Sequence, residues 1–313
     1  MPDDLRTRIG TLQYTSMEAI AMRWPAPVAK AIFRAYAFLT WRYIPSSRGI
    51  VAENLARVIG RPADSELVQS ATREAFELYA RYWYDTFRMR VTSKEEINRR
   101  FRCDGLEHLD KALADGRGAI LALPHLGNWD AAGYFLAVND YPLCAVAERL
   151  PNQRVFELFL QHREELGMKI VPLDTEGSAT RVGPQLLELL ADNWLIALVA
   201  DRDLTGRGVD VEMFGATRKL PAGPALLSLT AGSPMLVCQI YTTDEGWHCR
   251  IDAPFDTERA GEMRTDVAVL TRAMAARFES AIAAKPTDWH MFQPAWGGVD
   301  ETTREASPAA IPT

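Results

Sequence analysis

The sequence predicts an α/β domain with a central, mostly parallel mixed β-sheet flanked by helices. From residue 119 onward, short apolar runs alternate with longer segments of helical periodicity, as in βα units. Upstream, the stretches 10–60 and 64–90 hold only helical patterns. A chain of 313 residues with 48% hydrophobic content can bury a large core. We therefore expect a single domain over residues 1–313, with a catalytic core at 104–297.

The N-terminal segment, residues 5–60, is expected to form basic amphipathic helices. Its first part, residues 5–50, carries seven basic side chains and one acidic one, whereas the whole chain has a net charge of −6. Ile32, Tyr36 and Leu39 recur there at helical spacing. Such a face suits the headgroup region of an anionic membrane, and it equally suits packing against the body of the protein. The pattern alone leaves both interpretations open.

The remaining elements follow from periodicity and capping. A long aromatic-rich helix spans Asp64 to Arg90, and a capping box at Thr92-Ser-Lys-Glu95 opens a short helix. A charged loop is expected over 201–219, and a disordered tail over 300–313. The expected strands lie near 119–123, 143–147, 168–173, 194–200, 235–241 and 247–251, and further helices at 106–114, from 128, and at 152–166, 184–190, 221–231 and 264–283.

Two features bear on the compartment. The longest uncharged run, Leu220 to Thr243, is interrupted by prolines and glycines, which indicates a buried helix and a strand, not a membrane span. The first residues lack the charge and apolar pattern of a secretory signal, so we expect none. The four cysteines show no paired spacing, so we expect buried thiols and neither a disulfide framework nor a zinc site.

The turn after the strand at 119–123 is the first candidate for chemistry. Pro124 closes the strand, His125 lies in the turn, and Asn128 is a natural N-cap for the helix that carries Asp130. We expect the Asp130 carboxylate to fold back on the His125 imidazole, which would then act as a general base in acyl transfer. A histidine followed five residues on by aspartate is a short pattern, and a histidine in such a turn is often structural. The rest of the chain must therefore support the prediction.

That support comes from the ends of three strands, because ligands of open α/β sheets bind beyond the carboxyl ends of the strands. The first strand is followed by His125 and Asp130. The second ends in Ala147-Glu148-Arg149, and the helix after it carries Arg163. A third strand ends in Ala200-Asp201-Arg202-Asp203. Each cluster alone could be a surface ion pair or a solvated loop. The expected roles are oxyanion binding by the backbone N–H groups of Gly127, Asn128 and Trp129, phosphate or sugar binding by Arg149, Arg163 and Arg202, and orientation of a polyol by Glu148 and Asp201.

Several common catalytic motifs are absent from the sequence. It contains no G-x-S-x-G elbow, no P-loop, no G-x-G-x-x-G after a strand and no H-E-x-x-H. These absences disfavour a serine hydrolase, a nucleoside triphosphatase and a zinc protease.

The segment Pro124-His-Leu-Gly-Asn-Trp-Asp130 resembles the H-x4-D motif of the glycerolipid and lipid A acyltransferase superfamily. Further blocks resemble its actinobacterial branch, the phosphatidylinositol mannoside acyltransferases, and the resemblance covers roughly residues 10 to 297. The H-x4-D motif is superfamily-wide, whereas the other blocks together are more specific. These blocks are Ala147-Glu-Arg-Leu150, Ala200-Asp-Arg-Asp-Leu204, Phe214-Gly215, Pro221-Ala-Gly-Pro224 and Asp288-Trp-His-Met-Phe-Gln-Pro294.

The resemblance implies transfer of a fatty acyl group, typically palmitoyl, from acyl-CoA to the 6-hydroxyl of the mannose on the inositol 2-position. It implies a monomeric enzyme bound peripherally to the cytoplasmic face of the plasma membrane, with acyl-CoA as co-substrate and no metal or other cofactor. An anionic membrane surface, and no nucleic acid, is the expected partner. His125 would be the base and Asp130 its partner, with Glu148, Arg163 and Asp201 on the acceptor side. The branch often has Glu at the position of Asp201.

Two other functions remain open from the sequence. Asp201-Arg-Asp203 after a strand is a D-x-D pattern, as found in metal-dependent glycosyltransferases, although three-residue matches are common by chance. The basic segment at 10–50 is also compatible with a non-catalytic module that docks on anionic lipid. A requirement for acyl-CoA, and activity in the presence of a chelator, would exclude the first alternative, and CoA turnover would exclude the second.

Overall fold

The structure, a computed structural model, describes residues 2–173, 179–257 and 260–297. The tail predicted to be disordered, 300–313, lies outside the described residues. Within them, no helix combines the length and the apolar character needed to cross a membrane. The uncharged run 220–243 folds as predicted, into the helix α10 (Gly223–Ala231) and the strand β8 (Met235–Thr242).

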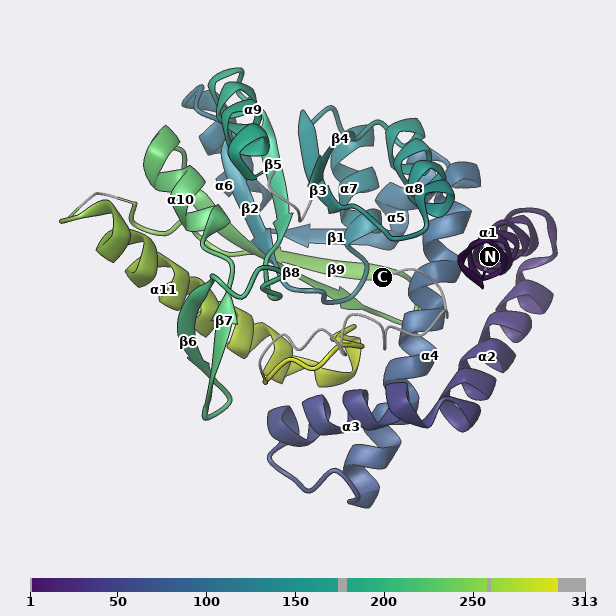
Figure 1. The fold of residues 1–313 in the computed structure, drawn as a ribbon. Coiled ribbons are helices and arrows are strands. Elements are labelled where there is room, and N and C mark those ends of the chain that lie inside the picture. Colours follow the sequence, from purple (N-terminus) through teal and green to yellow (C-terminus); the bar gives the residue numbers. More distant parts are fainter. Residues whose placement is uncertain (1, 174–178, 258–259, 298–313) are drawn as a thin grey trace.

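A seven-stranded sheet forms the centre of the described chain, in the order β1-β9-β8-β2-β5-β3-β4 (Figure 1). Only the β8–β9 pair is antiparallel, so the mostly parallel mixed sheet is confirmed. Strand β2 is fully buried because helices cover both faces of the sheet. The strands are β1 (Phe101–Asp104), β2 (Ala119–Leu123), β3 (Leu143–Glu148), β4 (Lys169–Leu173), β5 (Leu195–Val199), β8 and β9 (Trp247–Ile251).

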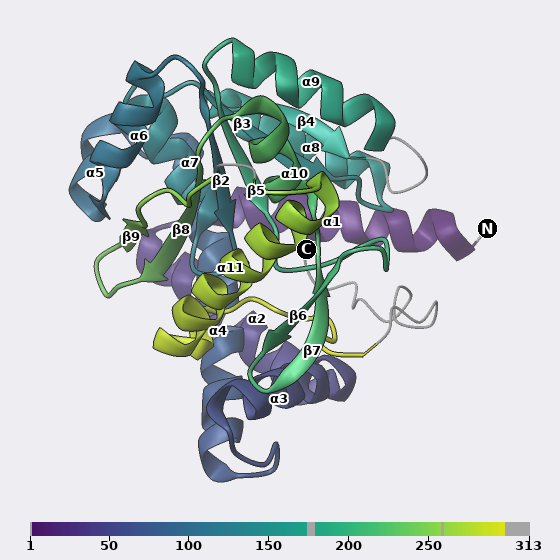
Figure 2. The ribbon, with the colours of Figure 1, turned by 90° about the vertical axis from the view of Figure 1, so that its left-hand side faces the viewer.

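Helices cover the two faces of the sheet. On one face pack α5 (Lys94–Arg100), α6 (Leu106–Ala114), α7 (Trp129–Val138) and α8 (Gln153–Glu165). On the other pack α9 (Ala179–Ala191), α10 and α11 (Met263–Ala284), as Figure 2 shows. The helix α9 begins five residues before the predicted start at Pro184, because the fixed φ of proline fits a helix and only one intrahelical hydrogen bond is lost.

The N-terminal helices form a separate layer beside α7 and α8 (Figure 1). The long helix α4 is capped by Ser65, and its aromatic side chains are core residues. Helix α2 packs on α4 through Ala29, Phe33 and Ala37, whereas Phe38 and Leu39 stay exposed. Part of the predicted amphipathic face therefore packs on the body and part faces outward. The helices are α1 (Pro2–Arg23), α2 (Ala26–Tyr43), α3 (Pro45–Ile59) and α4 (Glu66–Arg88).

The prediction of a charged loop at 201–219 was wrong for the second half of this segment. There the chain forms a hairpin of β6 (Val209–Met213) and β7 (Ala216–Leu220). Exposed and more buried side chains alternate along both strands, so one face of the hairpin packs on the core, and Arg218 lies on that face. Phe214 and Gly215 both have positive φ, as a two-residue hairpin turn requires. The short strand β1 was also missed. The cap of α5 is Ser93, one residue after the predicted Thr92.

Candidate active site

The turn that follows β2 is held against a segment from the C-terminal part of the chain. The N–H of Gly127 donates to the carbonyl of Asp288 (2.9 Å), and the N–H of His290 donates to the carbonyl of His125 (2.7 Å). Gly127 has φ +62°, and a Cβ at this position would lie 2.2 Å from the carbonyl oxygen of Ile240. Only glycine fits this close approach. The turn is thus fixed by neighbours that are remote in sequence.

His125 is oriented by Asp201, not by Asp130 as the sequence suggested. Its Nδ1 lies 2.5 Å from Oδ1 of Asp201, and its backbone N–H donates to Oδ2 at 3.0 Å. The strand pairing explains this contact, because β2 and β5 are parallel neighbours and both residues follow their carboxyl ends. Aspartate is one methylene shorter than the glutamate common in the branch, but it reaches the imidazole here. A carboxylate at Nδ1 favours the tautomer with its proton on Nδ1, in which Nε2 is the nitrogen that can accept a proton.

The Asp201 carboxylate is inaccessible to solvent and accepts a further hydrogen bond from Nε1 of Trp289 (2.8 Å). Burial alone would raise the pKa of Asp201, but the charge of His125 and the hydrogen bonds from His125 and Trp289 hold it well below its usual range. The backbone carbonyl of Asp201 accepts a hydrogen bond from the Arg218 guanidinium. Trp289 and Arg218 were not among the predicted site residues. Trp289 does lie in the Asp288–Pro294 block, which was the available signal.

Asp130 points away from His125 and forms a buried ion pair with Arg163. Nε of Arg163 donates to Oδ1 at 2.6 Å, and its second contact, to Oδ2, is 3.3 Å long. The hydroxyl of Tyr82 also donates to Oδ2 (2.6 Å). Burial would lower the pKa of Arg163, but the charge of Asp130 raises it. A buried guanidinium needs a carboxylate partner, so the carboxylate turns toward α8 instead of the imidazole.

The other predicted residues differ in what they contact. The Asn128 side chain is buried; it caps α7 through Ala131 N–H (2.9 Å) and donates to α4, so it supports the turn. Glu148 and Arg202 form an ion pair at the adjacent ends of β3 and β5. Arg149 is exposed and donates to Gln153 of α8 at 3.1 Å.

The N-terminus of α7 lies next to the imidazole. Trp129 packs edge-to-face with His125, with ring centroids 5.3 Å apart. The N–H of Gly127, expected to bind an oxyanion, is already taken by the Asp288 carbonyl. Among the described residues, the backbone N–H groups of Asn128 and Trp129 have no acceptor, as is usual for the first turn of a helix. These two N–H groups are the remaining donors for an oxyanion.

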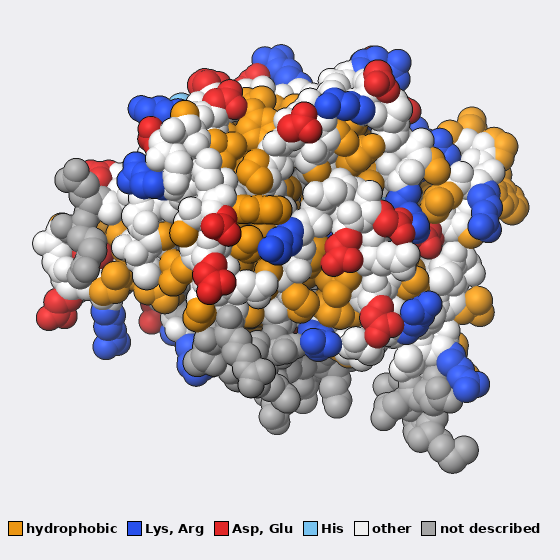
Figure 3. Space-filling model, turned by 90° about the horizontal axis from the view of Figure 1, so that it is seen from above, with side chains coloured by type: hydrophobic (Ala, Val, Ile, Leu, Met, Phe, Trp, Pro, Cys, Tyr) orange, Lys and Arg blue, Asp and Glu red, His pale blue; other side chains and the backbone are white. Residues whose placement is uncertain are grey.

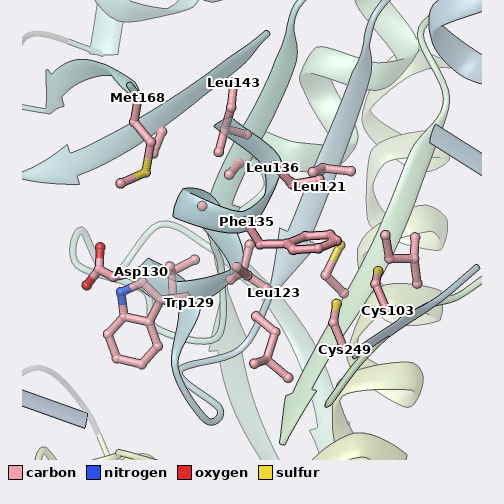
Figure 4. Close-up of a pocket in the computed structure, with 18 of the residues that line it drawn as sticks. Cys103, Leu121, Leu123, Trp129, Asp130, Phe135, Leu136, Leu143, Met168 and Cys249 are labelled. Atoms are coloured by element: carbon pink, nitrogen blue, oxygen red, sulfur yellow. The ribbon is translucent and has the colours of Figure 1, made fainter. Parts of the chain in front are cut away.

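An apolar cavity extends from Trp129 between α7 and the sheet (Figure 4). The space in it that can hold a water-sized molecule is about 60 Å³, and about 700 Å³ is reached only when the gaps between atoms and the open solvent are counted. The Asp130–Arg163 pair borders one end, and Phe101 and Cys103 of β1 line the other. Three strand spacings separate β2 from β1, which corresponds to roughly 14 Å. The four cysteines are free, and three of them are buried, as predicted; Cys103, Cys238 and Cys249 line this cavity.

The D-x-D interpretation finds no support in these contacts. The Asp201 carboxylate is engaged by His125 and Trp289, whereas that of Asp203 accepts from the backbone N–H groups of Thr205 and Gly208 within its own loop. In the described part of the chain, no cluster of three or more His, Cys, Asp or Glu side chains could hold a metal ion. The arrangement instead suits proton abstraction by a histidine that packs against Trp129, one of the residues that line the apolar cavity.

The known proteins that this chain resembles are lipid acyltransferases by name. The profile of the bacterial lipid A biosynthesis acyltransferase family matches residues 6–297. The chain is 36% identical to the phosphatidylinositol mannoside acyltransferase of Mycolicibacterium smegmatis over 291 residues, which is 92% of each chain. It is 39% identical to the enzyme of the same name from Mycobacterium tuberculosis over 246 residues, 78% of this chain and 75% of the relative. A lipid A biosynthesis acyltransferase of Haemophilus influenzae is 28% identical over 95 residues, 30% of each chain.

Proposed function

The chain belongs to the bacterial lipid A biosynthesis acyltransferase family, and from this membership we propose that it transfers a fatty acyl group, typically palmitoyl, from acyl-CoA to a phosphatidylinositol mannoside. The acceptor is the 6-hydroxyl of the mannose on the inositol 2-position. The enzyme works as a monomer bound peripherally to the cytoplasmic face of the plasma membrane. The names of the relatives support the acceptor, and the site geometry supports the chemistry.

The observation that carries the proposal is the 2.5 Å contact between His125 and Asp201 beside an apolar cavity. Nε2 of His125 takes the proton of the acceptor hydroxyl, whose oxygen attacks the thioester carbon. The carbon–oxygen bond forms, the tetrahedral intermediate collapses, and the carbon–sulfur bond breaks. The proton on His125 then passes to the CoA thiolate. Asp201 holds Nδ1–H and stabilises the imidazolium that forms between these steps.

The thioester is positioned by α7 and the cavity. The backbone N–H groups of Asn128 and Trp129 point their partial positive charge toward the oxyanion, and α7 adds its dipole. The acyl chain extends from Trp129 into the cavity toward β1. Burial of each methylene contributes about 0.8 kcal/mol, so a long chain provides much of the binding energy for the donor.

The acceptor lies on the outer side of His125, at the carboxyl ends of β3 and β5. Glu148 and Arg202 are partly exposed there and present hydrogen-bonding groups to sugar hydroxyls. Arg149 is exposed at the rim of the site, where its guanidinium binds a phosphate of the acceptor in addition to Gln153. Arg163 acts indirectly, because its charge is balanced by Asp130 inside the protein.

The N-terminal helices bring the site to the membrane. Leu5, Ile9 and Leu12 recur at i, i+4 and i+7 on α1, and their relative exposures are 62%, 54% and 67%. Figure 3 shows hydrophobic side chains gathered at the edge that carries α1 and α2. Exposed basic residues lie on the same helices, among them Lys30 and Arg34. Exposed apolar side chains with basic neighbours match the headgroup region of an anionic bilayer.

The test is the reaction itself. The purified protein is incubated with radiolabelled palmitoyl-CoA and phosphatidylinositol mannosides, and the acylated position is identified by mass spectrometry and NMR. We expect product on the mannose 6-hydroxyl with wild-type protein and with the control His108→Ala on α6, and almost none with His125→Ala. Folded His125→Ala with substantial turnover would refute His125 as the base. Absence of product from the wild-type protein would refute the acceptor.

A further inference from the structure

Arg218 of β7 is a buried cation next to the catalytic pair. Only 6% of the residue is exposed, and its guanidinium donates to the backbone carbonyl of Asp201. It also lies over the indole rings of Trp289 (5.9 Å) and Trp296 (5.2 Å). Nε and Nη1 of Arg218 have no hydrogen-bond partner among the described residues. The guanidinium has no ion pair of its own there, and its nearby negative charge is the Asp201 carboxylate.

The charge of the buried Asp201 carboxylate works against His125 as a general base. The Asp201 carboxylate, buried and in contact with Nδ1, favours the imidazolium form of His125, which cannot accept a proton. A second positive charge close to Asp201 disfavours the imidazolium and so preserves the neutral ring. His290, which lies beside the pair, is neutral because burial lowers its pKa to about 3. Of the charged groups nearby, Arg202 is balanced by Glu148 and Asp288 by Lys285, and the Asp203 carboxylate accepts from the backbone N–H groups of Thr205 and Gly208.

We propose that Arg218 is a positioning residue that holds the main chain at Asp201 and offsets its charge, so that His125 remains unprotonated and basic at neutral pH. The role rests on the proposed function, because it needs His125 as the base. The hairpin β6–β7 is then part of the catalytic apparatus. It delivers one cation to the backbone carbonyl of Asp201, and the two tryptophans keep that cation in place.

The experiment compares pH profiles of kcat/KM for wild type, Arg218→Gln, Arg218→Met and Arg218→Lys, with palmitoyl-CoA as donor. The control is Arg57→Gln, because Arg57 lies over the same Trp296 ring (5.2 Å) without contacting Asp201. We expect the acidic limb of both neutral variants to move to higher pH by about one unit, the effect of one nearby charge. The Arg218→Lys and Arg57→Gln limbs should stay with the wild type. Thermal unfolding of each variant verifies that it is folded.

Two results would overturn the role of Arg218. One is a neutral variant that is folded and slower but has the wild-type acidic limb, which would make Arg218 a structural residue only. The other is an Arg218→Lys limb displaced as far as that of Arg218→Gln, which would show that charge is not the cause. Failure of the proposed function looks different, because His125→Ala would then remain active or wild type would form no acylated lipid at any pH.

Discussion

Replacing Asp201 with asparagine tests which carboxylate serves the base. Oδ1 of Asp201 faces Nδ1 of His125, whereas Oδ2 receives two donors, the backbone N–H of His125 and the indole of Trp289. In Asp201→Asn the single amide oxygen is drawn to the position with two donors. The amide NH2 then faces Nδ1, which must act as an acceptor. The proton of the imidazole moves to Nε2, where it blocks proton abstraction from the acceptor.

The expected loss follows from this change of tautomer. An equivalent change in a histidine–aspartate pair costs about 10⁴-fold in kcat, so we expect a decrease of roughly 10³- to 10⁴-fold for Asp201→Asn. At about 1.36 kcal/mol per factor of ten, this is about 4 to 5.5 kcal/mol of transition-state stabilisation. Asp201→Glu keeps the charge and should retain much more activity than Asp201→Asn.

Asp130→Asn should behave in the opposite way. It leaves the Arg163 guanidinium buried without its carboxylate, which costs about 3 to 5 kcal/mol of folding stability. The tautomer of His125 is unaffected, because among the described residues Asp130 has no hydrogen bond to the imidazole. The main effect should therefore be a lower midpoint of unfolding. A folded fraction assayed below this midpoint should still turn over.

The assay measures kcat with labelled palmitoyl-CoA and the midpoint of chemical unfolding for both variants. Our reasoning would be refuted if Asp201→Asn kept more than about a tenth of wild-type kcat while folded Asp130→Asn lost nearly all of it. That pattern would show that Asp130, and not Asp201, is the carboxylate that supports His125 in catalysis. It would also imply that the carboxylates exchange partners when substrate binds.

Four further results are expected. Trp289→Phe removes one hydrogen bond to a buried carboxylate, worth about 1.5 to 3 kcal/mol, and should lower kcat roughly 10- to 100-fold. The unfolding midpoint should change less than in Asp130→Asn. An unchanged kcat would show that the indole does not support catalysis. Cys103→Phe fills the far end of the cavity and should lower kcat/KM for palmitoyl-CoA while sparing decanoyl-CoA; an equal loss with both donors would contradict the placement of the acyl chain. Binding to anionic vesicles, measured by co-sedimentation, should weaken at least tenfold in the triple variant Leu5→Gln, Ile9→Gln and Leu12→Gln. The control variant Val269→Gln changes an exposed apolar residue of α11 and should bind as the wild type does. Equal binding by both variants would exclude α1 as the helix that docks on the membrane. Burial lowers the pKa of His162 to about 4, so between about pH 6.5 and 4 the unfolded chain binds one more proton than the folded chain. As the pH is lowered through this range, the free energy of unfolding should fall by about 1.4 kcal/mol per pH unit for this group. Urea titrations of His162→Gln should show a smaller decline, and a decline equal to that of the wild type would assign the acid sensitivity to other groups.

The fold could be predicted from the sequence wherever one element buries enough apolar surface. The run Ala119–Leu123 reads as a buried strand because all of its side chains are apolar, and the structure buries every one of them. Asn128 caps α7 as predicted, because capping is a local interaction between a side chain and a backbone group three residues away. The hairpin β6–β7 was missed because its exposed face carries the charges of a loop. Its strand pairing depends on contacts with α11 and the core.

The sequence by itself determined the α/β class, the strand that ends at His125, and the candidate residues at the carboxyl ends of three strands. The tertiary structure alone decided which of these residues touch. Asp130 is five positions from His125 and pairs with Arg163, whereas Asp201, seventy-six positions away, is in contact with the imidazole. Asp130 turns to Arg163 because a buried guanidinium without a carboxylate is costly. Asp201 reaches His125 because β2 and β5 are parallel neighbours whose carboxyl ends meet at the same edge of the sheet. Strand order and helix packing, which a local pattern does not encode, determine where those donors lie.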